Sequence, residues 1–171
     1  PNHAKVATQL YLTPDGTPPQ ADAPKRPLLV AVGGAEGGNP WAGPRAQAMR
    51  NRFLADGYAV LAIGYFGLPD TPAKLDRIAL EGVRNAILET AKNPAIDARC
   101  IAMMGGSKGA ELTLLLASRT PEIKAVAAVV PGNAVFVGHT DEFDTSSFSE
   151  NGVELPYVPM TEEAVPALMA G

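Results

Sequence analysis

Residues 105–109 read Gly-Gly-Ser-Lys-Gly and separate two segments of different character. An apolar run, 100–104, precedes them, and a segment with the spacing of an amphipathic helix, 110–118, follows. A G-x-S-x-G sequence between a strand and a helix is the pattern of a nucleophile elbow, a sharp turn that exposes its serine hydroxyl. The pattern predicts that Ser107 is a nucleophile. A tight strand-to-helix turn without a ligand is the alternative interpretation.

Short apolar runs alternate with helical segments along most of the chain. Strands alternating with helices at this spacing indicate an α/β fold, in which a mostly parallel sheet has helices on both faces. A further strand is expected at 5–12, followed by a Pro-rich exposed connection at 17–26. The expected buried strands are 27–32, 58–63, 99–104 and 123–130, and the expected helices are 46–55, 78–91 and 110–118.

The pattern changes after Pro131. Residues 131–160 are rich in polar and aromatic residues and lack a helical period. Asn151-Gly152 lies between two short segments and is typical of a type I′ hairpin turn. We therefore expect 131–160 to be an excursion from the sheet that forms part of a lid or pocket rim.

Composition bounds the class of protein. With 171 residues the chain forms one domain, and its net charge of −4 gives no basic surface for nucleic acid. No apolar run approaches the roughly 20 residues of a membrane span. The single cysteine, Cys100, excludes an internal disulfide and is expected to be buried in its strand. Residue 1 is not Met, which indicates processing or a boundary within a longer chain and leaves localisation open.

Acyl transfer by a serine needs two donors that hold the oxyanion. The backbone N–H of Lys108, next to the serine, is one candidate. The second is expected from the Gly-rich segment 33–38, which follows an apolar strand, and Ala35 is the best candidate within it. A phosphate-binding loop is the weaker interpretation, because this segment contains neither a Walker motif nor G-x-G-x-x-G.

The general base has no clear candidate. Only two histidines are present, His3 and His139. In the expected order an acidic residue precedes the histidine, whereas Asp141, Glu142 and Asp144 follow His139. Both histidines are therefore expected at the surface.

The other polar residues are expected to have a structural role rather than a catalytic or metal-binding one. Lys108 and Glu111 are three residues apart at the start of a helix and are expected to form a solvated ion pair. No cluster of His, Cys, Asp and Glu has metal-ligand spacing. We expect neither a metal nor an organic cofactor.

Several segments together resemble a known family. The string GGSKGAEL at 105–112 looks like the elbow of the C-terminal domain of acyl-CoA thioesterases and bile acid-CoA:amino acid N-acyltransferases, an α/β-hydrolase. More distantly, the chain is similar to dienelactone-hydrolase-like esterases. The similarity covers most of 27–160, and further matching segments are GGAEGG at 33–38, GYAVLA at 57–62, LDRIALE at 75–81, SSF at 146–148 and NGVELPY at 151–157.

The resemblance implies a Ser or Cys nucleophile, with Asp and His on strands downstream of the excursion. Ser107 matches the nucleophile, and a serine favours hydrolysis over amino-acid conjugation. No residue matches the Asp or the His, because the chain ends at Gly171. We therefore expect residues 1–171 to be one incomplete α/β-hydrolase domain, truncated before its last strands, with 123–130 as an exposed apolar edge.

Three explanations for the missing Asp and His remain open. The chain is a fragment or one piece of a cleaved protein, a second chain completes it, or it is a shortened homologue that binds acyl compounds without hydrolysing them.

The expected function is hydrolysis of a small-molecule acyl thioester or carboxylic ester through an acyl-serine intermediate. The alternatives are a non-catalytic acyl-binding or assembly module and an acyl-CoA:amine N-acyltransferase.

Overall fold

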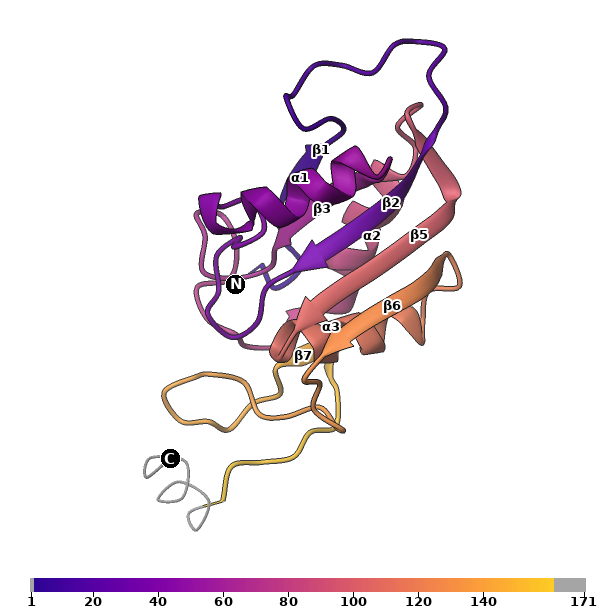
Figure 1. The fold of residues 1–171 in the computed structure, drawn as a ribbon. Helices are drawn as coiled ribbons and strands as arrows, with labels where there is room; N and C mark the ends of the chain where they lie inside the picture. The colour runs from indigo at the N-terminus through magenta and orange to yellow at the C-terminus, as the bar shows by residue number, and fades with distance from the viewer. Residues whose placement is uncertain (1, 162–171) are drawn as a thin grey trace.

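The sheet is built around β2, and its strand order is β1-β3-β2-β5-β6 (Figure 1). The computed structural model describes residues 2–161. β1 pairs antiparallel with β3, whereas the β2–β3, β2–β5 and β5–β6 pairs are parallel. The mostly parallel sheet is therefore confirmed. The strands are β1 (Ala7–Tyr11), β2 (Arg26–Val32), β3 (Ala59–Gly64), β5 (Ile96–Gly106) and β6 (Ile123–Val129).

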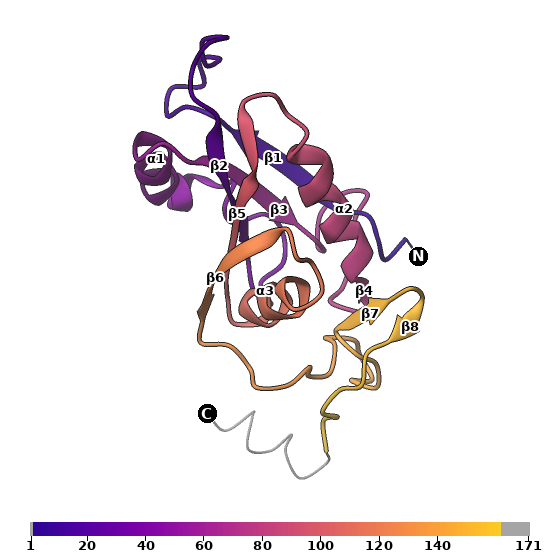
Figure 2. The same ribbon diagram turned by 90° about the vertical axis from the view of Figure 1, so that its right-hand side faces the viewer.

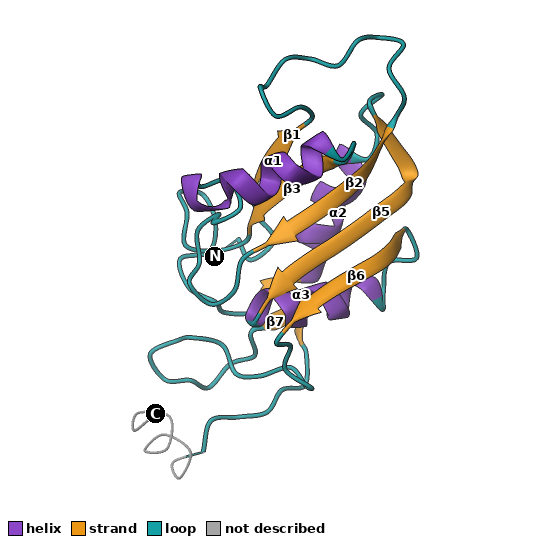
Figure 3. Ribbon diagram, in the orientation of Figure 1, coloured by secondary structure: helices purple, strands orange, loops and turns teal. Residues whose placement is uncertain are grey.

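Helices cover both faces of the sheet, as expected (Figures 2 and 3). A 3₁₀ turn, η1 (Pro44–Ala46), leads into α1 (Gln47–Ala55), which lies on one face. On the other face lie α2 (Leu80–Thr90) and α3 (Lys108–Ala117). These layers bury β2 and β3, which explains why both strands are apolar at nearly every position.

The excursion forms a small second sheet beside the N-terminus of α2. Residues 78–79, expected to begin a helix, instead form a short strand, β4 (Ile78–Ala79). β4 pairs with β7 (Phe148–Glu150), which forms a hairpin with β8 (Val153–Glu154). The hairpin turn has φ of +51° at Asn151 and +78° at Gly152, so the positive φ values of a type I′ turn are confirmed.

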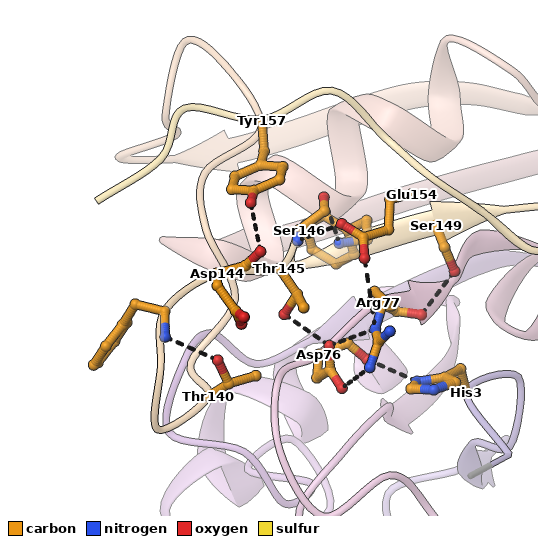
Figure 4. A network of polar contacts seen from close by, with 12 residues as sticks. His3, Asp76, Arg77, Thr140, Asp144, Thr145, Ser146, Ser149, Glu154 and Tyr157 are labelled. Carbon is orange, nitrogen blue, oxygen red and sulfur yellow. Dashed lines mark hydrogen bonds and ion pairs between the residues drawn. The ribbon is translucent and has the colours of Figure 1, made fainter. Parts of the chain in front are cut away.

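A polar network anchors the excursion to the segment before β4 (Figure 4). Both oxygens of the Asp76 carboxylate accept hydrogen bonds from the Arg77 guanidinium, at 2.8 and 2.9 Å, and Thr145 donates a further one. The Asp76 carbonyl lies 2.8 Å from Nδ1 of His3. His3 is thus half-buried rather than on the surface, because the N-terminal segment packs against this network.

The expected burial of Cys100 is wrong, because its side chain is exposed. β5 is longer than the sequence predicts, and its register against β2 is interrupted. Pro27 pairs with Asp97, but Leu28 pairs with Ile101. Residues 98–100 therefore bulge out of the sheet into solvent.

β6 forms an apolar edge of the sheet, as expected. One side of β6 pairs with β5, and within residues 2–161 no strand pairs with the other side. Val126 and Val129 are 43% and 55% exposed. The carboxyl ends of β2, β5 and β6 all point toward the excursion, so segments that follow them meet at one end of the sheet (Figure 1).

Candidate active site

Ser107 occupies a strained turn between two regular elements. β5 ends at Gly106 and α3 begins at Lys108. Ser107 itself has φ +52° and ψ −119°, a conformation that costs a non-glycine residue about 1–3 kcal/mol. Its N–H donates to the carbonyl of Val129 at 2.9 Å, and its carbonyl accepts from the N–H of Ala110 at 3.0 Å. The neighbouring elements thus hold the sharp turn that the G-x-S-x-G pattern predicts, and the serine is exposed.

Glycines let three backbone segments pack together around this turn. A Cβ on Gly109 would collide with the carbonyl of Gly33, and one on Gly105 would collide with the carbonyl of Gly109. A Cβ on Gly34 would lie 3.3 Å from Cβ of Ser107. The segment after β2 therefore runs directly beside the serine, where the sequence predicts an oxyanion loop.

Two side chains hold the backbone of this loop. The Tyr65 hydroxyl lies 2.9 Å from the Gly33 carbonyl and 3.2 Å from that of Gly34, and it donates to them. Burial, with a smaller contribution from the nearby Glu36 charge, raises the pKa of Tyr65 far above its usual range, so the hydroxyl remains a donor. The Glu36 carboxylate accepts the Gly34 N–H at 3.0 Å. The sequence pattern contains no signal for either contact.

The two expected donors have free backbone N–H groups. Within residues 2–161, neither the N–H of Ala35 nor that of Lys108 donates a hydrogen bond to another described residue. Lys108 is the first residue of α3, where backbone N–H groups have no partner inside the helix. Within these residues, the fold itself uses neither N–H group.

A cavity of about 620 Å³ opens beside Ser107. Most of its wall is apolar, and Glu36 and Arg45 supply its charged side chains. The excursion, expected to form the rim, contributes none of the described lining residues. Instead the wall comes from the segment after β2, the start of α1 and the ends of β5 and β6, and its larger apolar side chains belong to Val32, Pro40, Trp41, Met49, Met104, Val129 and Val130.

Lys108 and Glu111 form the expected ion pair at 3.2 Å, but it is buried rather than solvated. Their side chains are only 11% and 5% exposed. Burial lowers the pKa of Lys108, and the Glu111 charge opposes this effect. The ammonium also donates to Oγ of Ser147 in the excursion at 2.8 Å. Sequence reasoning missed Ser147, because a contact across 39 residues leaves no mark in local spacing.

No general base contacts Ser107 within the described part of the chain. His139 is exposed, and its backbone N–H donates to the carbonyl of Leu75. Partial burial and the Lys108 charge lower the pKa of His139. Asp141 pairs with Lys74 at 2.6 Å. Neither residue forms a hydrogen bond with the serine in residues 2–161, where there is also no group of acidic, His and Cys side chains that would hold a metal.

Solved structures with a similar fold are α/β-hydrolases. An α/β-hydrolase, GrgF from Penicillium sp. sh18, superposes with a TM-score of 0.55 and 19% identity, over 74% of this chain and 46% of the other. Est1E from Butyrivibrio proteoclasticus, solved with ferulic acid, gives a TM-score of 0.55 and 21% identity, over 74% and 49% of the two chains. The fold is therefore that of an α/β-hydrolase. No described helix is long and apolar enough to cross a membrane.

Proteins with a similar sequence are acyl-coenzyme A thioesterases. Acyl-coenzyme A thioesterase 5 of Mus musculus is 32% identical over 107 residues, which cover 63% of this chain and 25% of the relative. Acyl-coenzyme A thioesterase 6 of Homo sapiens is 37% identical over 78 residues, or 46% and 18% of the two chains. The chain thus spans about a quarter or less of these relatives. The family model described as BAAT / Acyl-CoA thioester hydrolase C terminal matches residues 78–169, more than half of the chain. This protein therefore belongs to the BAAT / acyl-CoA thioester hydrolase C-terminal family.

Proposed function

We propose that this chain carries the nucleophile of a hydrolase that cleaves acyl thioesters or carboxylic esters. Oγ of Ser107 attacks the acyl carbonyl, the N–H groups of Lys108 and Ala35 stabilise the oxyanion, and the thiol or alcohol leaves. Water then hydrolyses the acyl-serine. The observation that carries this proposal is the strained Ser107 beside the N–H of Lys108, which donates no hydrogen bond within residues 2–161.

The wall of the cavity favours an acyl substrate. The apolar side chains of Trp41, Met49 and Val129 lie in the same cavity as Ser107, so an aliphatic or aromatic acyl group would bury its surface there. The sequence relatives are acyl-coenzyme A thioesterases, which favours a thioester over an oxygen ester. The proton of Ser107 passes to a base outside the described residues, from another part of the protein or from a partner chain.

Replacing the nucleophile tests this proposal. We expect Ser107→Ala to lower kcat/KM for acyl-CoA or aryl ester hydrolysis by at least about a thousandfold, because no acyl-enzyme forms. Ser118→Ala, an exposed serine at the end of α3, is the matched control and should retain activity. Intact mass after fluorophosphonate treatment should show one adduct, on Ser107. Hydrolysis that survives in Ser107→Ala would contradict the proposal.

A non-catalytic acyl-binding module is the second candidate. It is favoured by the absence of a histidine contact to Ser107 within residues 2–161. Under this alternative the wild type binds a non-hydrolysable acyl-CoA thioether but neither turns over the thioester nor reacts with the fluorophosphonate. A third outcome, an amide product in the presence of an amine, would indicate an acyltransferase.

A further inference from the structure

The Lys108–Glu111 pair is buried in a place where substrate contact does not explain it. Neither side chain lines the cavity beside Ser107, and both are nearly inaccessible to solvent. Taking an ammonium and a carboxylate out of water is costly unless further hydrogen bonds satisfy both groups. The partners of this pair therefore indicate what it does.

Those partners come from the excursion. The ammonium donates to Oγ of Ser147 and lies 5.5 Å from the centre of the Phe136 ring. The Glu111 carboxylate accepts the backbone N–H of Phe136 at 3.1 Å. Oγ of Ser147, in turn, lies 2.8 Å from the Phe136 carbonyl and 3.0 Å from that of Val137, to which it donates. One ion pair thus joins both ends of segment 136–147 to the first turn of α3.

The same segment is fixed independently on its other side. The backbone N–H groups of Arg77 and Ile78 donate to the carbonyls of Ser146 and Ser147, at 2.8 and 2.9 Å. Asp76 accepts a hydrogen bond from Thr145 (Figure 4). The excursion therefore connects the start of α3 to the start of α2, through the ion pair at one side and β4 at the other.

We propose that the side chains of Lys108 and Glu111 are positioning residues that fasten the first turn of α3 to the excursion and thereby orient the N–H of Lys108. The inference rests on the proposed function, in which this N–H stabilises the oxyanion. The first turn of a helix has no hydrogen bonds from its N–H groups to preceding helical carbonyls. Its orientation thus depends on contacts such as these. A small displacement of an oxyanion donor has a large effect on rate.

The test uses the full chain. It separates the destabilising effect of an unpaired buried charge from the loss of the positioning role of Lys108 and Glu111. Lys108→Met alone leaves a buried carboxylate without its cation and is expected to fold poorly. The double variant Lys108→Met with Glu111→Gln has no buried charge and keeps an acceptor for the Phe136 N–H. Lys92→Met is the matched control, because Lys92, just after the end of α2, forms with Glu89 an i,i+3 pair in which both side chains are 70% exposed.

We expect the folded double variant to show about tenfold faster amide hydrogen exchange at residues 136–147 and a kcat about tenfold lower, with KM within about twofold of the wild type. Lys92→Met should change none of these quantities. Unchanged exchange, or faster exchange with an unchanged kcat, would overturn the inference. A rise in KM with an unchanged kcat would also overturn the inference, because it would indicate a role in substrate binding.

Failure of the inference is distinguishable from failure of the proposed function. If Ser107→Ala abolishes hydrolysis but the double variant matches the wild type, the function stands and the positioning role is wrong. If neither the wild type nor Ser107→Ala hydrolyses a substrate when the rest of the protein or the partner chain that supplies the base is present, the proposed function fails. In that case the exchange measurement still reports whether the ion pair fastens the excursion.

Discussion

At the scale of single residues, the site depends on side chains that hold backbone groups in place. Ser107 keeps a strained φ of +52° because β5, β6 and α3 hold its peptide groups on every side. Tyr65 likewise holds the loop after β2 in place, since its hydroxyl donates hydrogen bonds to the carbonyls of Gly33 and Gly34. Neither Tyr65 nor the ion pair at Lys108 lines the cavity.

Removing the Tyr65 hydroxyl tests this loop. We expect Tyr65→Phe to lower kcat about tenfold with little change in KM, because in the proposed function the loop that carries the Ala35 donor is no longer held by this hydroxyl. Stability should fall by about 1 kcal/mol, the value of one hydrogen bond. Steady-state kinetics and urea unfolding measure the two effects. Tyr58→Phe, an exposed tyrosine, is the control, and an equal loss of kcat in both variants would contradict the role of Tyr65.

At the scale of elements, the site exists because α3 starts very close to the end of β2. The carbonyl of Gly33 occupies the position that a Cβ of Gly109 would need. This contact brings the loop after β2 and the elbow together, and it requires glycine at position 109.

A pair of glycine substitutions tests this contact. We expect Gly109→Ala to destabilise the protein by about 2–3 kcal/mol, because the new methyl group forces α3 away from β2. Gly106→Ala is the matched control on the other side of Ser107, where a Cβ would meet nothing within 4 Å. Its effect should stay below about 1 kcal/mol. Chemical denaturation compares the two variants, and equal losses would show that close packing at Gly109 is not the cause.

The junction before β4 makes stability depend on pH. The hydrogen bonds from Arg77 hold the pKa of Asp76 below its usual range. A carboxylate with a lowered folded pKa stabilises fully above its unfolded pKa of about 3.9, and this stabilisation is lost as pH falls through the folded value. Because Arg77 is 40% exposed, we expect Asp76→Asn to cost only about 1 kcal/mol at pH 7.

Denaturation between pH 7 and pH 2 measures this effect. The difference between Asp76→Asn and the wild type should shrink as pH falls below about 3.9 and through the lowered folded pKa, because the wild-type carboxyl becomes protonated. Asp22→Asn, in the exposed connection between β1 and β2, should match the wild type throughout. A difference that persists unchanged at low pH would show that the Asp76 charge is not responsible.

At the scale of the whole molecule, the sheet ends in an apolar strand. β6 presents unpaired backbone groups along its free edge within the described part of the chain, and Val126 and Val129 are largely exposed beside them. Long apolar edges pair with other strands. Val130, which follows β6, is 77% exposed and has φ +48°, unusual for a β-branched residue.

The edge predicts self-association of the 171-residue chain made on its own. We expect sedimentation velocity to show species larger than the monomer as concentration rises, and Val126→Lys to shift the distribution toward the monomer. Val153→Lys is the control, because Val153 is 68% exposed on the hairpin, away from this edge. If Val153→Lys shifts the distribution as much as Val126→Lys, the edge is not the contact.

The sequence by itself determined the α/β class, the sequence order of most elements, the family and the elbow around Ser107. The class, the order and the elbow follow from local patterns, such as apolar runs, helical periods and glycines at a turn, which act within a few residues. The family follows instead from the resemblance of whole strings, such as 105–112, to known members. Only the tertiary structure decided that Cys100 bulges into solvent, that residues 78–79 form a strand, and that the Lys108–Glu111 ion pair is buried. Each of these depends on a partner far along the chain, such as β2, β7 or Ser147. The local spacing of residue types cannot predict such partners, because burial and strand pairing depend on how distant segments pack together.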